Sequence, residues 1–351
     1  MTTSLRERLA AQIIQTGPLT VAQYMIACLH DPQDGYYATR PALGETGDFI
    51  TAPMVSQMFG ELVGVWAMSA WAQMGEPADI AVVEAGPGDG TMMDDVLRAA
   101  RARPGFLEAA DVWLVETSPP LRAKQHQRLG DRVRWARTLD EVPAGRPVIL
   151  VANELLDCLP ARQFARGPLG WSEQVIGTDA AGALIFARVP APGGLPDARD
   201  GAILEISAAQ EALGETIGAR VVRDGGAALL IDYGRDTPGF GDTLQALRDH
   251  RKVDPLACPG QADLTVHADF PAVMAAARRA GAAATILTQA QFLARMGIGE
   301  RAEALVRARP DRAAVIGRQL NRLIGGDQMG ELFKACCIHS TDWTPPAFEA
   351  A

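Results

Sequence analysis

Three glycines at alternate positions, Gly86, Gly88 and Gly90, lie between an apolar run and a stretch of helical spacing. Glycine lets the backbone turn sharply and approach a ligand closely, and the start of a helix adds unpaired N–H groups. Val82 to Thr91 therefore predicts a strand, a ligand-binding turn and a helix. An ordinary tight turn between strand and helix is the alternative.

Three classes of ligand use such a turn. A phosphate loop needs a Gly-Lys-Ser/Thr ending, which is absent. A dinucleotide fingerprint needs glycine where Thr91 stands. In dinucleotide-binding proteins the ribose-binding acid follows the glycine turn by roughly 20 residues, and the interval from Gly86 to Glu116 is longer than that. This disfavours a dinucleotide oxidoreductase. The E/D-x-G-x-G-x-G turn of S-adenosylmethionine enzymes remains, and it fits from Glu84 to Gly90.

That interpretation assigns roles to two carboxylates. Glu84 and the turn backbone are expected to bind the amino-acid end of S-adenosylmethionine. Glu116 follows the apolar run Val112 to Val115 and is expected to bind the ribose, because two vicinal hydroxyl donors suit one carboxylate. An exposed acid at a strand end is the alternative for Glu116.

A polar loop follows the apolar run Val148 to Ala152 and contains Asn153, Glu154 and Asp157. We expect these residues to be catalytic and to face the transferred methyl group, with Asn153 also contacting the cofactor. Paired carboxylates can orient a guanidinium or an amine through charge-assisted hydrogen bonds before its lone pair attacks. The alternative is that Asn153 or Asp157 caps a following helix.

Asp48 is expected to bind the cofactor, and Asp232 and His267 are possible additions to the site. Asp232 ends another apolar run, where turn chemistry is the alternative. His267 and Asp269 alternate as on a strand and are either a base with its orienting carboxylate or a polar strand face. Asp48 follows Gly47 and is expected to close over the cofactor; the alternative is a turn followed by a short extended segment. The five histidines show no metal-ligand spacing, so no metal site is expected.

The elements that must position these residues change character along the chain. From residue 80, short apolar runs alternate with helical stretches, which predicts βαβ units and a parallel sheet. We expect residues 1–75 to form an N-terminal helical segment covering the cofactor site. Residues 76–351 are expected to form the core, with antiparallel strands inserted at about 161–190 and further additions at about 241–330.

Composition excludes several classes of protein. The 351 residues are 48% apolar and 21% charged, which is typical of globular proteins, and the net charge of -9 argues against binding nucleic acid or an anionic membrane. No run of about 18 apolar residues predicts a membrane span. The five cysteines include no C-x-x-C pair, and the first residues lack an apolar signal region. These features favour a cytoplasmic enzyme.

Ordered motifs along most of the chain resemble the MidA-like family of S-adenosylmethionine-dependent methyltransferases, which includes a mitochondrial assembly factor of respiratory complex I. The resemblance extends from Gly35-Tyr36-Tyr37 to about Gly299. Its markers are Gly47–Pro53, Glu84–Thr91, Glu116–Pro119, Ala152–Pro160, Asp232–Gly234, Asp242–Gln245, Asp254–Leu256, Pro259–Gly260, Asp263–Phe270, Thr288–Gln289 and Phe292–Leu293.

The resemblance implies a fold and an activity. The expected fold is α/β, a Rossmann-like methyltransferase core with a mostly parallel sheet of the seven-stranded type, an N-terminal helical segment, inserted antiparallel strands and helical additions. The implied activity is methylation of arginine in a protein substrate, a complex I core subunit, in support of complex I assembly. A homodimer is possible. The alternative is an assembly chaperone that binds a partner subunit and uses S-adenosylmethionine only structurally.

Overall fold

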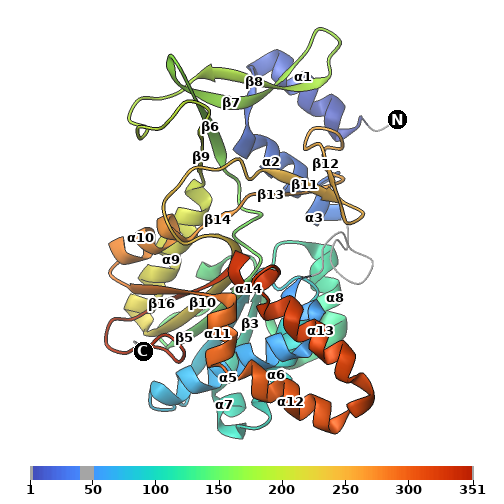
Figure 1. Cartoon of the computed structure of the whole chain (residues 1–351). Helices are drawn as coiled ribbons and strands as arrows, with labels where there is room; N and C mark the ends of the chain where they lie inside the picture. The colour runs from blue at the N-terminus through green and yellow to red at the C-terminus, as the bar shows by residue number, and fades with distance from the viewer. Residues whose placement is uncertain (1–2, 40–50, 350–351) are drawn as a thin grey trace.

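A computed structural model describes residues 3–39 and 51–349 of the chain, which form a larger lobe around an open sheet and a smaller lobe beside it (Figure 1). The larger sheet has the strand order β15-β16-β10-β5-β2-β3-β4, and the short β14 also pairs with β10. Its strands are β2 (Ile80–Ala85), β3 (Ala110–Val115), β4 (Arg134–Ala136), β5 (Val148–Asn153), β10 (Gly226–Arg235), β14 (Ala268–Asp269), β15 (Ala283–Thr288) and β16 (Phe333–His339).

Strand direction in this sheet confirms the expected α/β core. The strands from β10 to β4 are parallel to one another, whereas β16 is antiparallel to both of its neighbours. The register places Asn153 beside Ile231 and Glu84 beside Val151. The carboxyl ends of the parallel strands therefore meet at one edge, where ligands bind in open α/β sheets.

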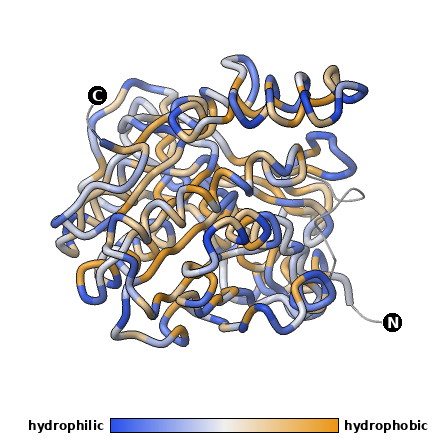
Figure 2. The backbone as a smooth tube through the Cα atoms, turned by 90° about the horizontal axis from the view of Figure 1, so that it is seen from below, coloured by the Kyte–Doolittle hydropathy of each residue, from blue (hydrophilic) through white to orange (hydrophobic). Residues whose placement is uncertain are grey.

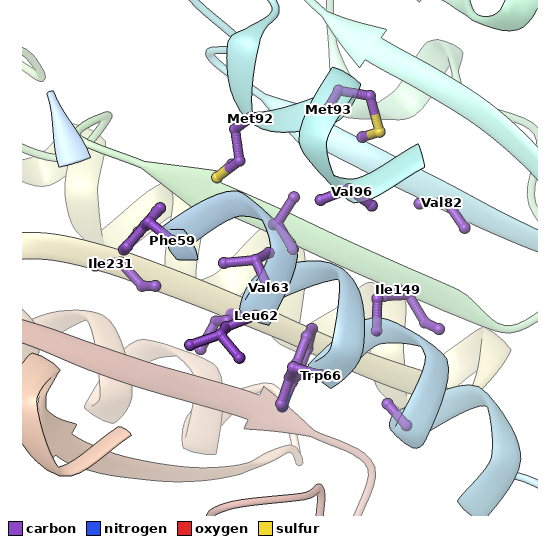
Figure 3. Packing of buried hydrophobic residues seen from close by; sticks show 14 of the residues in the cluster. Phe59, Leu62, Val63, Trp66, Val82, Met92, Met93, Val96, Ile149 and Ile231 are labelled. Atoms are coloured by element: carbon purple, nitrogen blue, oxygen red, sulfur yellow. The ribbon is translucent and has the colours of Figure 1, made fainter. Parts of the chain in front are cut away.

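Helices cover both faces of the sheet. Phe59, Val63 and Trp66 of α5 pack against Val82, Ile149 and Ile231 of the sheet and against α6 (Figure 3). On the other face, α9 and α10 pack on each other and on the sheet. The helices of this lobe are α4 (Ala52–Val55), α5 (Gln57–Gln73), α6 (Thr91–Ala100), α7 (Pro104–Ala109), α8 (Pro119–Leu129), α9 (Ala208–Asp224), α10 (Phe270–Arg279), α11 (Gln289–Arg295), α12 (Ile298–Ala308), α13 (Ala313–Ile324) and α14 (Met329–Leu332).

The second lobe is built around an antiparallel sheet, which confirms the antiparallel strands expected after residue 161. Two strands join it from outside the expected insertion, β1 and β9. Its elements are α1 (Leu5–Thr16), β1 (Leu19–Thr20), α2 (Val21–His30), α3 (Tyr36–Thr39), β6 (Arg162–Gly167), β7 (Gly170–Thr178), β8 (Leu184–Pro190), β9 (Ile203–Ile206) and a small sheet of β11 (Gln245–Arg248), β12 (Arg251–Val253) and β13 (Asp263–Thr265).

Local signals explain why the first helices of this lobe form. Ser4 and Thr20 are the N-caps of α1 and α2, and each makes a reciprocal capping box with the residue three positions on, Glu7 or Gln23. Their apolar faces join one buried cluster with the antiparallel sheet and β13. The segment before β2 thus contributes α1 and α2 to the second lobe and α5 to the main sheet. The boundary near residue 75 stays a prediction.

Residues 264–270, where the alternation of His267 and Asp269 predicts a strand, do not form one continuous strand. The chain pairs with the small sheet in β13, leaves it, and pairs with the main sheet in β14, so that His267 lies between two sheets. The backbone N–H and C=O groups of β13 and of β14 find their hydrogen-bond partners in different sheets. This pairing, and not the alternation of residue types, decides where each strand ends. In the view from below, many of the hydrophobic segments run through the middle of the molecule (Figure 2). Over residues 3–39 and 51–349, none of the helices is both long and apolar enough to cross a bilayer.

Candidate functional site

A cavity of about 500 Å³ lies where the second lobe meets the carboxyl edge of the main sheet. The loops after β2, β3, β4 and β5 form much of its wall, and α9 adds small and apolar side chains. The second lobe contributes His30, Tyr37 and Asp263. Seven of the residues predicted from sequence line this cavity: Glu84, Gly86, Gly88, Glu116, Asn153, Glu154 and Asp157.

The turn after β2 requires glycine. Gly86, Gly88 and Gly90 have φ values of +66°, +54° and +83°, in the left-handed region that residues with a Cβ adopt rarely. A Cβ on Gly86 would also lie 2.9 Å from Cδ1 of Leu155. Gly90 is the N-cap residue of α6 and, unlike Gly86 and Gly88, is not among the described residues that line the cavity.

Glu84 is buried at the end of β2, and its Oε2 has no hydrogen-bond partner. Burial, followed by the charges of Asp89 and Glu116, raises the pKa of Glu84 well above its ordinary value. A buried carboxylate is stabilised by a cation or by donors that reach it. Because Glu84 lines the cavity, that partner can come from a ligand with an ammonium group.

Glu116 is held by two donors. Its Oε1 accepts the backbone N–H of Ser118 at 2.7 Å, and its Oε2 accepts Nε2 of Gln125 at 3.2 Å. The fully buried Gln125 also donates to the carbonyl oxygen of Gly88 at 2.7 Å and accepts from Trp135. Gln125 thus ties the glycine turn to Glu116. Sequence reasoning missed it because no spacing sets one glutamine apart on a polar helix.

The loop after β5 holds Glu154 in a strained conformation, with φ of +51°. Its N–H donates to the carbonyl of Ile231 at 2.8 Å, and its Oε1 accepts from the N–H of Ala52 and from Nδ2 of Asn153, each at 3.0 Å. Burial, then the charge of Asp157, raises the pKa of Glu154 to about 8. The buried Oδ1 of Asn153 has no partner.

Asp232 lies behind this loop and outside the residues that line the cavity. Its Oδ2 accepts the N–H groups of Leu156 and Asp157 at 2.8 and 3.1 Å, and its Oδ1 accepts that of Tyr233 at 2.8 Å. Asp232 therefore fixes the loop that presents Asp157. Burial raises the pKa of both carboxyl groups. A turn and then β6 follow β5, so neither Asn153 nor Asp157 caps a helix.

Two other predicted residues are not brought to the cavity wall. His267 is half-buried, donates its backbone N–H to Oγ1 of Thr243 at 2.8 Å and contacts the ring of Tyr233. Asp269, its expected carboxylate partner, instead pairs with Arg235 and caps α10. Asp48 lies outside the described residues. Within the described parts of the chain, no group of three or more potential ligands is placed to hold a metal ion.

The three lining residues from the second lobe, His30, Tyr37 and Asp263, were missed as site residues. The hydroxyl of Tyr37 donates to Oδ1 of Asp263 at 2.8 Å, and the Tyr37 ring lies against His30 with ring centres 6.1 Å apart. Tyr37 and Asp263 fall in segments that carry the family resemblance, which is the one signal for them in the sequence, whereas His30 precedes those segments. Nothing in their spacing indicates that Tyr37 and Asp263 meet.

The cavity is acidic. Six carboxyl groups line it, and the basic side chains among its described lining residues are His30 and Arg137. Asp89 is paired with Arg128 at 2.9 Å, and Arg128 is not among the described lining residues. The carboxyl groups are Glu84, Asp89, Glu116, Glu154, Asp157 and Asp263. Such a cavity favours cationic ligands over anionic ones.

Comparison with known proteins agrees with this geometry. A family model described as an S-adenosyl-L-methionine-dependent methyltransferase matches residues 62–288. A solved structure from Burkholderia thailandensis, bound to S-adenosyl-homocysteine, superposes with a TM-score of 0.87 at 30% identity, covering 99% of this chain and 95% of that one. A native structure from the same organism gives a TM-score of 0.85 at 29% identity over 99% and 94% of the two chains.

Curated relatives show similar coverage. The mitochondrial protein arginine methyltransferase NDUFAF7 of Danio rerio is 33% identical over 370 residues, covering 96% of this chain and 87% of the relative. That of Homo sapiens is 35% identical over 337 residues, covering 87% and 76%. Because these relatives are named mitochondrial, the expectation of a cytoplasmic location is wrong.

Proposed function

Because the chain belongs to the MidA-like family of S-adenosylmethionine-dependent methyltransferases, we propose that it methylates arginine in a protein substrate. The observation that carries the proposal is the acidic wall formed by Glu154 and Asp157 in the same cavity as the glycine turn. A guanidinium needs carboxylates to orient it, and each good charge-assisted pair fixes both position and direction. The similarity to relatives named protein arginine methyltransferases supports this acceptor.

The residues present fit S-adenosylmethionine. The unpartnered Oε2 of Glu84 suits the ammonium of the amino-acid end, and the paired oxygens of Glu116 suit the ribose hydroxyls. Asn153, which also lines the cavity, supplies one more acceptor in its unpartnered Oδ1. When bound, the cofactor supplies a methyl group on a cationic sulfur that a nitrogen lone pair can attack.

The chain's own part in the reaction is positioning and proton transfer. Glu154 is proposed to accept a guanidinium N–H and to take up the proton that the nitrogen loses, since its raised pKa of about 8 makes it a better base than an ordinary carboxylate. Asp157 holds the other edge of the guanidinium, and Asp232 keeps Asp157 in place through the loop backbone. Correct placement of two reactants supplies most of the rate enhancement in such a displacement.

The substrate protein that the family resemblance implies is a respiratory complex I subunit, and we propose it as the first acceptor to test. The purified chain is incubated with S-adenosylmethionine carrying a labelled methyl group and with complex I subunits from cells lacking this protein. Mass spectrometry of digested subunits should find label on arginine. Label on another residue type would contradict the proposal, and assembly of complex I without any label would favour the chaperone alternative.

A further inference from the structure

The carboxyl groups of the cavity form two electrostatic groups. The charges that raise the pKa of Glu84 come from Asp89 and Glu116, whereas the charge that raises the pKa of Glu154 comes from Asp157. Asp263 belongs with the second group, because Asp157 and Asp263 both raise the pKa of the Tyr37 hydroxyl. Three carboxyl groups are therefore gathered at one part of the cavity, and the one at residue 263 comes from the second lobe.

Asp263 is fixed there by its own strand. It is buried, with 4% of its surface exposed, and it pairs across the small sheet with Leu247. Three residues further on, the N–H of Val266 donates to the backbone oxygen of Asp157 at 2.9 Å. This hydrogen bond joins the chain after β13 to the loop after β5, so the two carboxylates are held by segments that contact each other.

Tyr37 is held between the two lobes. Its backbone oxygen accepts from Oγ of Ser118 at 2.6 Å, on the main lobe, and its hydroxyl donates to Oδ1 of Asp263 at 2.8 Å, on the second lobe. Ser118 follows Glu116, whose carboxylate it also holds. Tyr37 therefore orients the Asp263 carboxylate relative to the main lobe.

We propose that Asp263, oriented by Tyr37, is a specificity-determining residue that selects a guanidinium as the methyl acceptor. The inference rests on the proposed arginine methylation. A guanidinium presents five N–H donors spread over a plane, so carboxylates from different directions can bind it together, whereas an ammonium presents three donors on one compact nitrogen. Glu154 and Asp157 come from the loop after β5, and Asp263 adds a carboxylate from β13 of the second lobe.

The test uses three S-adenosyl analogues in which the methyl group is replaced by a short alkyl chain. The chain ends in a guanidinium, an ammonium or a methyl group, and each analogue is titrated calorimetrically into the whole protein. We expect the guanidinium end to bind at least about ten-fold tighter than the methyl end in the wild type, as a charge-assisted contact implies. The gain from the ammonium end should be smaller.

Variants then show which residues account for the tighter binding of the guanidinium-ended analogue over the methyl-ended one, which is called the guanidinium gain. Asp263→Asn should reduce the guanidinium gain to less than about three-fold and leave the methyl-ended analogue unaffected, which also shows that the variant folds. Tyr37→Phe keeps the carboxylate and removes one hydrogen bond, so it should reduce the gain by a smaller factor. Asp254→Asn is the matched control, since Asp254 is an exposed carboxylate of the same lobe outside the cavity lining.

The outcomes separate this inference from the proposed function. A wild-type protein that gains nothing from the guanidinium end would contradict arginine as the acceptor. Two results would overturn the role of Asp263 while leaving arginine as the proposed acceptor. One is a guanidinium gain that is as large in Asp263→Asn as in the wild type, and the other is an equal loss of affinity for all three analogues in that variant. An ammonium gain equal to the guanidinium gain would overturn the selectivity. If Asp263→Asn does not fold, an unchanged gain in Tyr37→Phe overturns the proposed pair.

Discussion

The two parts of the cavity are built in different ways. The cofactor part, with Glu84, the glycine turn and Glu116, comes from two neighbouring strands and the loops that follow them within about 30 residues of chain. The acceptor part joins Tyr37, Asp157 and Asp263, which lie far apart in the sequence and on both lobes. On the proposed assignments, the main sheet supplies the residues for the cofactor and the second lobe adds residues for choosing the acceptor.

If this comparison holds, single substitutions should affect one part and spare the other. The largest effect is expected for Glu154→Gln, which keeps an oxygen for the N–H of Ala52 but cannot take up a proton. The turnover number should fall about 100-fold, as loss of a general base does. The affinity for S-adenosylmethionine should stay within about three-fold of the wild type. Turnover and calorimetric affinity measured on the same preparation check both, and normal turnover would remove Glu154 from the mechanism.

Glu84→Gln should weaken the binding of S-adenosylmethionine and leave the turnover number at saturating cofactor nearly unchanged. Losing the charge that faces the ligand ammonium should weaken cofactor binding by about 10- to 100-fold, the range of a charged hydrogen bond. At saturating cofactor the turnover should recover to near the wild-type value. A turnover deficit that persists at saturation would mean that the two parts are not separable at this residue.

Gln125→Leu tests how the cofactor part is held together. The variant removes both N–H donors that link Gly88 and Glu116 and leaves the Glu116 carboxylate short of a partner. We expect about a ten-fold loss of cofactor affinity. Gln127→Leu, on the same helix and exposed, is the control and should change affinity little. Equal behaviour of the two variants would show that the buried link is unimportant.

The pH dependence should report the acceptor part. The pKa of Glu154 is raised to about 8, so the carboxylate needed to bind the guanidinium forms as pH rises through that value. The kcat/KM for the acceptor should therefore increase about ten-fold per pH unit below pH 8 and level off above it. Glu154→Gln should abolish this pH dependence. A wild-type kcat/KM that is constant from pH 6 to 9 would argue against Glu154 as the group whose ionisation controls the reaction.

The smallest expected effect is on stability. The native pKa of Glu154 lies above its ordinary value of 4.5, so the native state binds the proton more tightly than the unfolded state. Its contribution to stability is fully present below pH 4.5 and is lost as pH rises through about 8. Glu154→Gln should therefore melt at a higher temperature than the wild type at pH 9, by about 2 °C or more. The difference should vanish near pH 4.5, where both side chains are neutral.

The difference between the cofactor part and the acceptor part of the cavity also explains which site residues the sequence could predict. The glycine turn, Glu84, Glu116 and Asn153 to Asp157 each follow an apolar run directly, so the parallel sheet brings them to one edge once its strands are recognised. The positions of Asp263 and His267 depend on which of two sheets pairs with their segment, and alternation of residue types does not distinguish these partners. Tyr37 and Gln125 contribute through contacts that tertiary packing alone creates.

The most direct test of the central claim is a calorimetric titration of S-adenosylmethionine into the ligand-free wild type, Glu84→Gln and Glu154→Gln. The account predicts micromolar binding to the wild type and to Glu154→Gln, and binding weaker by at least about ten-fold to Glu84→Gln. No binding to the wild type, or the same loss in both variants, would contradict the division of the cavity into a cofactor part and an acceptor part.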